Sequence, residues 1–425
     1  MSQSKGWSIS PHVQNSLAWS IIGEAFYPEC ISHVPRTKLE DNVTCPTSKA
    51  LRGYPNLNDF SQIRLRVLLV IKMTDQLPTL RWGIVATGLI SSWFVQDLVL
   101  DRENAKAKHI VQAIGSSSLE KGKVFAEKYL PGKTPTIYGN YEELYADPNV
   151  DIVYIGTPHA FHKQNCLDAI NAGKHVLCEK AFTLNAMEAK EVFEAAEKKG
   201  VFVMEAMWTR FFPLTRTLIK LLHEDKAIGN IHRVFCDFAM DQNIASLGPE
   251  SRLKNPALGA GSLLDIGIYS LTWGLLGLDE SIGEKAQTSE IVAKQTLDAG
   301  VDIATSAVLL YSDGKQAIVS SSSSVKTKPV FCTIQGSQGY VDIEGFTSAP
   351  QFFTVYSLKD GSSKKYKFER PGRGFYWEAD AVALDITARR VQNDIMPWAE
   401  TLRVLGILDE IRRQGGAKFP QDAIA

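Results

Sequence analysis

The 425-residue sequence has few of the features that mark secreted, membrane-bound or nucleic-acid-binding proteins. Its six cysteines show no spacing typical of a metal site or a disulfide framework, which favours reduced thiols in the cytoplasm. The longest apolar run near the start, residues 67–71, is too short to span a bilayer and lies too far in for a signal peptide. A formal net charge of -1 gives no electrostatic reason to expect a nucleic acid or a membrane surface as a partner.

The composition that is present, 44% hydrophobic and 22% charged residues, is typical of a soluble globular protein, and the length is sufficient for two or three domains. Residues 1–72 lack sustained periodicity, and we expect either a disordered extension or a segment outside the working protein. The rest divides into a nucleotide-binding domain, residues 73–205, and a second domain, residues 206–417, of the α+β type.

Residues 80–91 read Leu-Arg-Trp-Gly-Ile-Val-Ala-Thr-Gly-Leu-Ile-Ser and predict a strand, a tight turn and the start of a helix. Gly88 would let a ligand approach the backbone, while the free N–H groups at the helix start, at Leu89 and Ile90, face a phosphate. Only the central glycine of the dinucleotide fingerprint Gly-x-Gly-x-x-Gly is present, because Ala86 and Ser91 occupy the other positions. Taken alone, the pattern is equally compatible with a glycine that merely turns a strand into a helix.

Strands and helices then alternate up to residue 204, which predicts a doubly wound parallel sheet of the Rossmann type and therefore an α/β fold. The expected strands are residues 109–115, 136–138, 151–156, 174–178 and 201–204. Ligands of such sheets bind at the carboxyl ends of the strands, where Gly88, Thr157 and Lys180 are all expected.

The end of the second strand indicates which dinucleotide is preferred. An NAD-specific unit would place an acidic residue there to hold the ribose 2′-hydroxyl. The sequence has instead Ser117 and Ser118, followed by Lys121. Hydroxyl groups, helix-start amides and a lysine suit a 2′-phosphate, so NADP is favoured over NAD. Ser118 is also expected to cap the helix 119–130.

His159 and His162 follow Thr157 at a strand-to-helix junction, with a spacing that could serve a metal. No further cluster of cysteine, histidine or carboxylate supports a metal, and we assign no metal site. Two readings remain open. The histidines line the cofactor and substrate cleft, or they only cap and hydrogen-bond the loop.

Lys180 ends a strand, where it would border the cofactor cleft. From its position alone, however, a solvated loop lysine is the preferred reading. Asp265 and Tyr269 are four residues apart in an otherwise apolar helix after the glycine-rich turn 259–261. A lysine beside the tyrosine would lower the pKa of the phenol towards the range of a general base. A buried tyrosine that merely bonds a structural aspartate is the alternative.

These residues occur in motifs that resemble one family, the glucose-fructose oxidoreductase/inositol dehydrogenase family, and within it the branch of fungal NADP-dependent D-xylose 1-dehydrogenases and dimeric dihydrodiol dehydrogenases. The resemblance extends from about residue 80 to about residue 416. The motifs that carry it are Arg-Trp-Gly-Ile at 81–84, Thr-Pro-His at 157–159, Cys-Glu-Lys at 178–180, Met-Glu-Ala-Met-Trp-Thr-Arg-Phe at 204–211, residues 261–269, Gly-Phe-Tyr-Trp-Glu-Ala-Asp at 374–380 and Met-Pro-Trp-Ala-Glu-Thr at 396–401.

The resemblance implies that Lys180 and Tyr269 are the catalytic pair, with Asp265 close by and Trp208 on the substrate side of the nicotinamide. Glu179 and Arg210 belong to the same motifs and are assigned with Trp208 to the cofactor site. The implied reaction is NADP-dependent oxidation of D-xylose at C1 to the lactone. Oxidation of a trans-dihydrodiol is the first alternative, and a non-catalytic NADP-binding regulator is the second.

Two positions depart from the family pattern. Ala86 stands where the first glycine of the fingerprint is usual, and we expect a tighter turn that still admits a phosphate. Ala181 replaces the proline that usually follows the lysine, which leaves open how rigidly the backbone after Lys180 is held.

The second domain is expected to contain a large open, mostly antiparallel sheet. The predicted strands are residues 231–241, 290–295, 304–311, 315–322, 331–335, 340–343 and 351–356, and helices are expected at 211–224, 375–391 and 400–413. Helices on one face leave the other face to be covered, and the family resemblance implies a homodimer through this sheet. Phe375 and Tyr376 are candidate substrate contacts.

Overall fold

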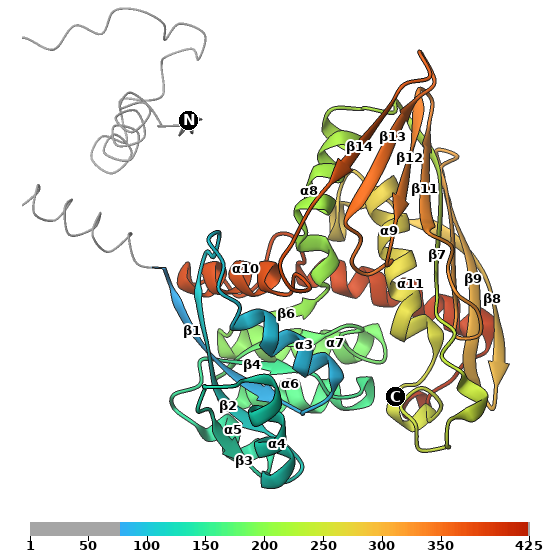
Figure 1. Ribbon diagram of the computed structural model, residues 1–425. Coiled ribbons are helices and arrows are strands. Elements are labelled where there is room, and N and C mark those ends of the chain that lie inside the picture. The colour runs from blue at the N-terminus through green and yellow to red at the C-terminus, as the bar shows by residue number, and fades with distance from the viewer. Residues whose placement is uncertain (1–76, 424–425) are drawn as a thin grey trace, which may run out of the picture. The chain divides into compact units, whose positions relative to one another are not determined.

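A computed structural model describes residues 77–423, so the predictions for residues 1–72 lie outside the described part of the chain. The first domain is built on six parallel strands in the order β3-β2-β1-β4-β5-β6 (Figure 1). The strands are β1 (Thr79–Val85), β2 (Lys108–Gly115), β3 (Thr136–Tyr138), β4 (Ile152–Ile155), β5 (His175–Glu179) and β6 (Val203–Ala206). This order confirms the predicted Rossmann sheet. Strands β2 and β3 are added on one side of β1 and strands β4, β5 and β6 on the other, and such sheets bind their ligands at this switch point between β1 and β4.

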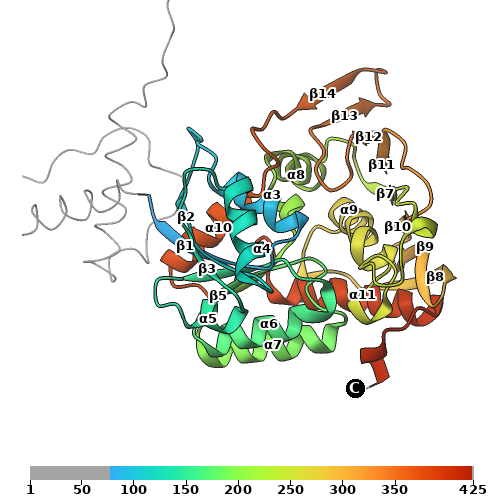
Figure 2. The same ribbon diagram turned by 60° about the horizontal axis from the view of Figure 1, so that its bottom comes forward.

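Helices cover both faces of this sheet. They are α3 (Leu89–Leu98), α4 (Leu119–Tyr129), α5 (Tyr141–Ala146), α6 (His162–Asn171) and α7 (Ala186–Lys199). Helices α3 and α4 pack together on one side, and α6 and α7 pack together on the other (Figure 2). The predicted cap at Ser118 is confirmed, because its side chain accepts a hydrogen bond from an amide of the first turn, and Asn140 and Asn185 cap α5 and α7 in the same way.

The second domain contains an eight-stranded sheet in the order β14-β13-β12-β11-β7-β10-β9-β8. Its strands are β7 (Ile231–Ala239), β8 (Ser289–Asp298), β9 (Val301–Tyr311), β10 (Gln316–Ser322), β11 (Val330–Gly336), β12 (Gly339–Glu344), β13 (Phe352–Ser357) and β14 (Ser363–Lys367). All neighbours are antiparallel except β7 and β10, which confirms a mostly antiparallel sheet.

One face of this second sheet is covered by α9 (Ile268–Leu278) and α11 (Trp398–Gly415), which pack against β7, β10 and β8. No helix of residues 77–423 covers the opposite face in the two ribbon views (Figures 1 and 2). Within the described range, the helical stretch Pro256–Leu278 has the length and hydropathy to cross a membrane, but 89% of its most apolar window is buried in the protein.

The predicted division at residues 205 and 206 differs from the arrangement in space. Strand β6 of the first sheet extends to Ala206, and α10 (Tyr376–Thr387) packs against α3 of the first domain. Asp380 of α10 accepts hydrogen bonds from Arg102 and lies 3.0 Å from His109 Nε2. The chain therefore returns from the second domain to complete the first, a contact between distant segments that local sequence patterns do not encode.

Candidate active site

The predicted site residues follow the carboxyl ends of neighbouring strands of the first sheet. Gly88 follows β1, Thr157 follows β4, Lys180 directly follows β5 and Trp208 follows β6. Because parallel strands end at the same edge, the sheet gathers side chains that lie as much as 120 residues apart in the sequence.

The turn after β1 leaves open space at Gly88. Its φ of -80° is accessible to any residue, and a Cβ built on it would lie 3.9 Å from the nearest atom, the carbonyl oxygen of Gly156. The protein's own packing therefore does not require glycine there, whereas the close approach of a pyrophosphate to the start of α3 would. A side chain would fill the cradle that the cofactor's phosphates need.

The two other fingerprint positions are accommodated locally. Ala86 has a φ of 75°, in the left-handed region that glycine favours, so the turn retains the usual conformation at some cost in strain. Ser91 lies against Gly156, where an added Cβ would come within 2.4 Å of the serine Oγ. The close helix-to-strand approach that the third glycine usually permits is provided here by a glycine on the opposite side of the contact.

The turn after β2 presents donors at the protein surface. Lys121 Nζ donates to Ser117 Oγ at 3.1 Å, while the Lys121 amide donates to Ser118 Oγ at 3.3 Å. Ser117 and Lys121 are exposed, and Ser118 is the N-cap of α4. A hydroxyl, a lysine and a helix start lie together as predicted, in an arrangement that suits an anion.

The two predicted histidines have different surroundings. His159 Nδ1 lies 3.1 Å from the carbonyl oxygen of Gly259, and burial lowers the pKa of His159 to about 3, so the ring is neutral. His162 is 0% exposed, and its nitrogens face three carbonyl oxygens, those of Thr157, Ala181 and Phe182, at 2.8 to 3.2 Å. The assignment of His162 to the cofactor site is therefore wrong, and the alternative role in bonding the loop applies to it.

Lys180, Asp265 and Tyr269 come together from the two domains. Lys180 Nζ donates to the backbone carbonyl of Asp265 at 2.6 Å, lies 3.6 Å from Asp265 Oδ1 and sits 5.1 Å above the ring of Tyr269. The Lys180 side chain is only 12% exposed, which excludes the simple reading of a solvated loop lysine. Asp265 lies in a π-helical turn, Leu263–Gly267, rather than in the regular helix that the spacing predicts.

The phenolic oxygen of Tyr269 accepts a hydrogen bond from Trp208 Nε1 at 2.8 Å. Trp208 in turn stacks on Phe375, with ring centroids 4.0 Å apart and planes at 6°. Phe238 from the end of β7 meets the Tyr269 ring edge-on at 5.7 Å. The structure supports neither predicted substrate contact: Phe375 is fully buried behind Trp208, and the hydroxyl of the buried Tyr376 donates to the carbonyl of Pro371. Sequence reasoning missed Phe238, because no local pattern distinguishes one apolar strand residue from its neighbours.

Electrostatics at the site correct the prediction for Tyr269. Burial raises the pKa of Tyr269 well above its ordinary value, and the nearby Glu179 raises it further. The expected lowering by Lys180, whose ammonium lies 5.1 Å from the centre of the ring, does not outweigh burial. Burial would also raise the pKa of Asp265, but Lys180 and Arg252 together hold it well below its usual range.

Two further predicted cofactor residues are buried behind the site. Arg210 is 2% exposed and forms an ion pair with the buried carboxylate of Glu400, so its assignment to direct cofactor contact does not agree with its placement. Glu179 accepts hydrogen bonds from Tyr154 Oη at 2.5 Å and from the Lys180 amide at 3.2 Å, and burial raises its pKa to about 7. These groups support the loop around Lys180 from inside.

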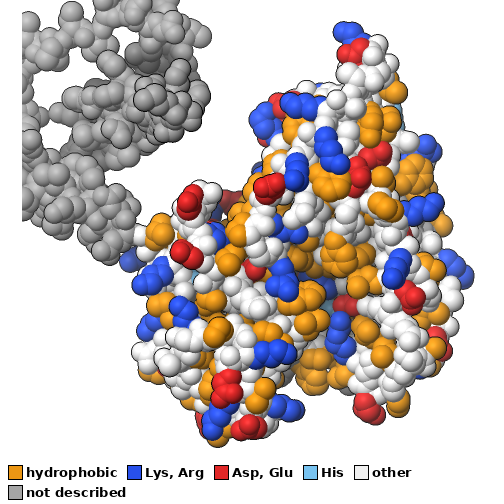
Figure 3. All heavy atoms as spheres, viewed as in Figure 1, with side chains coloured by type: hydrophobic (Ala, Val, Ile, Leu, Met, Phe, Trp, Pro, Cys, Tyr) orange, Lys and Arg blue, Asp and Glu red, His pale blue; other side chains and the backbone are white. Residues whose placement is uncertain are grey.

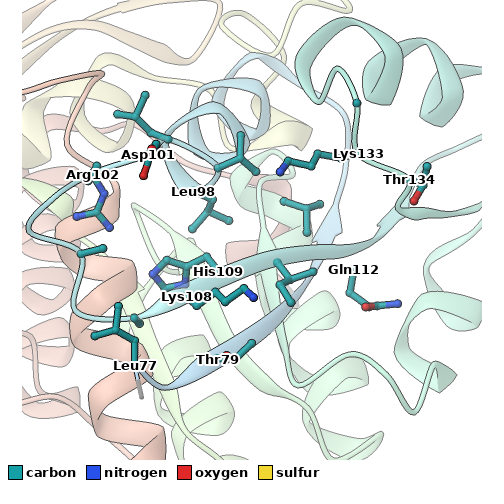
Figure 4. A pocket seen from close by; sticks show the side chains of 17 residues that line it. Leu77, Thr79, Leu98, Asp101, Arg102, Lys108, His109, Gln112, Lys133 and Thr134 are labelled. Carbon is teal, nitrogen blue, oxygen red and sulfur yellow. The ribbon is translucent and has the colours of Figure 1, made fainter. Parts of the chain in front are cut away.

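Two surface features lie apart from this site. A hollow of about 1100 Å³ is lined at the amino-terminal ends of β1 and β2 by residues that include Thr79, Lys108 and Gln112 (Figure 4), and no predicted site residue lines it. On the face seen in Figure 3, basic and acidic side chains are interspersed. That face offers no extended patch of one charge.

Comparisons with known proteins agree with this architecture. Residues 80–207 match a family described as the oxidoreductase family with an NAD-binding Rossmann fold, and residues 216–342 match the GFO/IDH/MocA C-terminal domain. A D-xylose 1-dehydrogenase (NADP(+)) from Hypocrea jecorina is 33% identical over 81% of this chain and 94% of its own length. The chain belongs to the GFO/IDH/MocA oxidoreductase family.

Other relatives of this GFO/IDH/MocA protein have different substrates in their names. A trans-1,2-dihydrobenzene-1,2-diol dehydrogenase from Sus scrofa is 34% identical over 81% of this chain and 99% of its own. The crystal structure of an aldose-aldose oxidoreductase from Caulobacter crescentus complexed with glycerol superposes with a TM-score of 0.67, at 25% identity, over 80% of this chain and 98% of the other. The protein is therefore an NAD(P)-dependent oxidoreductase acting on CH–OH groups.

Proposed function

We propose that the protein oxidises D-xylose and related aldoses at C1 to the lactone, with NADP as hydride acceptor. The observation that carries this proposal is the meeting of Lys180, Asp265 and Tyr269 beside Trp208, next to a turn whose Gly88 leaves room for a dinucleotide. Proton removal and hydride departure take place on one carbon, so the base and the cofactor must face that carbon together.

The roles of the residues follow from their contacts. Tyr269 carries the proton: as phenolate it takes the proton of the C1 hydroxyl, and as phenol it returns one in the reverse direction. Lys180, anchored by Asp265, keeps a positive charge near the reacting oxygen. Trp208 fixes the phenol through its indole N–H and offers an apolar face to the carbon skeleton of the substrate, while the fully buried Phe375 supports the indole from behind.

Activity with the intact protein tests this function. NADPH formation at 340 nm would be followed with D-xylose, D-glucose and a trans-dihydrodiol, each with NADP and with NAD. We expect turnover of D-xylose with NADP, and a fall in kcat of about 10²- to 10⁴-fold in Tyr269→Phe with unchanged NADP affinity. NADP binding without turnover by the wild-type protein would instead favour the non-catalytic regulator.

The preference for NADP rests on Ser117, Ser118 and Lys121, whose donors face solvent together after β2. Replacing Ser117 by aspartate adds a negative charge beside the proposed 2′-phosphate position and should reverse the preference towards NAD. The kcat/KM ratio for the two cofactors measures this. An unchanged ratio in Ser117→Asp would place the 2′-phosphate elsewhere.

A trans-dihydrodiol is the second candidate substrate, and the aromatic surroundings favour it. Trp208 and Phe238 form an apolar wall against Tyr269 that would suit a ring with few hydroxyl groups. The same wall also fits the C–H face of a sugar. Parallel assays of both substrates rank the two candidates.

We also propose a homodimer that works in the cytoplasm, with the uncovered face of the second sheet as the interface. The exposed Phe235 and Val292 lie on this face, together with Tyr340 and Tyr356, whose rings stack 4.5 Å apart. Pairing would remove this apolar surface from water. Sedimentation should give a dimer at micromolar concentration, and Phe235→Asp should shift it to monomer. A wild-type monomer would refute the interface.

A further inference from the structure

Arg252 lies at the outer side of the cluster formed by Lys180, Asp265 and Tyr269. It belongs to the segment between the short helices Ile244–Ser246 and Pro256–Leu258, which precedes the turn that carries Asp265. Its Nη1 donates to Asp265 Oδ1 at 3.2 Å, the same oxygen that faces Lys180 Nζ at 3.6 Å. The side chain of Arg252 is 54% exposed, whereas that of Lys180 is 12% exposed. Asp265 therefore lies between the buried ammonium of Lys180 and the half-exposed guanidinium of Arg252.

The polar neighbours of Asp265 form one side of the site. Gln242, just beyond β7, brings Nε2 to within 3.4 Å of Asp265 Oδ2. Within residues 77–423, Nη1 is the one nitrogen of Arg252 that donates to a protein acceptor, and the side chain is 54% exposed, which leaves Nε and Nη2 available to a ligand. Around Tyr269 the surroundings are aromatic instead, with Trp208 and Phe238. The site thus has an apolar side and a donor-rich side.

We propose that Arg252 determines substrate class by binding hydroxyl groups beyond the reacting one and its direct neighbour, so that it favours polyhydroxylated aldoses over diols. This inference rests on the proposed function. A guanidinium donates in a fixed fork and forms charge-assisted hydrogen bonds with oxygen acceptors. An aldose ring offers such oxygens along its length, whereas a dihydrodiol has only its vicinal pair. With a bound diol, the N–H donors of Arg252 would hydrogen-bond only to water.

The test compares wild type with Arg252→Met, which keeps much of the length of the side chain and removes its donors. We expect kcat/KM for D-xylose with NADP to fall about 10- to 100-fold, the effect of losing a hydrogen bond to a charged group. For a trans-dihydrodiol we expect a change below about 3-fold. Where one compound is not oxidised, its inhibition constant against the other replaces kcat/KM. Arg413→Met is the control: this arginine of α11 is 71% exposed and pairs with Glu410, so its loss should change neither value.

Other outcomes overturn the inference. An equal loss on both compounds, with a displaced pH profile, would mean that Arg252 acts only by holding Asp265. No loss on D-xylose would mean that the guanidinium touches no substrate. If the wild-type protein neither oxidises nor binds any of the compounds, the proposed function itself fails, and this is seen before any variant is compared.

Discussion

Replacing Gly88 by alanine separates what the fold requires from what a bound dinucleotide requires. The added Cβ would lie 3.9 Å from the carbonyl oxygen of Gly156, an ordinary contact, and the φ of -80° suits alanine. Alanine is a poorer N-cap than glycine by about 0.5–1 kcal/mol, but it restricts the unfolded chain and recovers about 0.4–1 kcal/mol. We therefore expect the free energy of unfolding to change by less than about 1 kcal/mol.

Cofactor binding should respond far more strongly to the same change. The methyl group would occupy the space through which the pyrophosphate reaches the amides at the start of α3. Loss of one hydrogen bond to a charged group costs about 1.5–3 kcal/mol, which corresponds to roughly a 10- to 100-fold rise in the dissociation constant for NADP. Calorimetric titration with NADP measures this effect, and thermal unfolding followed by circular dichroism measures stability.

A second glycine supplies the control. Gly406 lies exposed in α11, and a Cβ there would meet nothing within 4 Å. Gly406→Ala should raise stability slightly and leave NADP affinity unchanged. A dissociation constant for Gly88→Ala within 2-fold of wild type, or a fall in Tm beyond about 5 °C, would refute the reasoning. The first result would place the phosphates elsewhere, and the second would give the glycine a role in the fold itself.

Three further predictions concern the groups around this site. Burial raises the pKa of Tyr269 above the range of the assay, so the phenolate needed for oxidation becomes more abundant throughout as the pH rises. We therefore expect kcat/KM for oxidation to increase from pH 6 to pH 9. A flat profile would exclude Tyr269 as the base. Gly156→Ala places a Cβ 2.4 Å from Ser91 Oγ and should lower the free energy of unfolding by about 1–3 kcal/mol, measured by denaturant titration. Adding Ser91→Ala removes the clashing oxygen and should restore part of this loss; if the losses of the two single variants simply add in the double variant, the contact is contradicted. Burial raises the pKa of Asp302 to about 6, above its ordinary 3.8, so the folded state binds this proton more tightly than the unfolded state. The unfolding free energy of wild type should therefore gain about 2–2.5 kcal/mol relative to Asp302→Asn as the pH falls from 7 to 4; a constant difference would show that Asp302 does not titrate in this range.

Local signals in the sequence predict the first domain well. The caps Ser118, Asn140 and Asn185 need only residues within one helical turn, and the buried strands of a parallel sheet are continuous apolar runs. Strand β14 has no such signal. Its residues are Ser-Lys-Lys-Tyr-Lys, only the tyrosine is partly buried, and it pairs on one side as an edge strand. Lysines are typical of such edges because they discourage pairing with another chain.

Contacts between distant segments were beyond sequence reasoning. Asp97 near the end of α3 accepts hydrogen bonds from the amides of Arg373, Gly374 and Phe375, and this holds the loop whose Phe375 stacks on Trp208. An aspartate inside a predicted helix gives no indication of a partner 276 residues away. The raised pKa of Tyr269 has the same origin, because it depends on the depth of burial that only the assembled domains create.

The departure at Ala181 shows how the fold replaces a covalent restraint. A proline after Lys180 would fix a backbone angle through its ring. Here His162 faces the carbonyl oxygens of Ala181 and Phe182, and Glu205 accepts from the Phe182 amide at 3.1 Å. Glu205 is itself held by Thr401 of α11 at 2.9 Å. Buried hydrogen bonds of this kind are costly to break, since each leaves an unpaired polar group away from water. The backbone that carries Lys180 is therefore fixed by α6, β6 and α11 together.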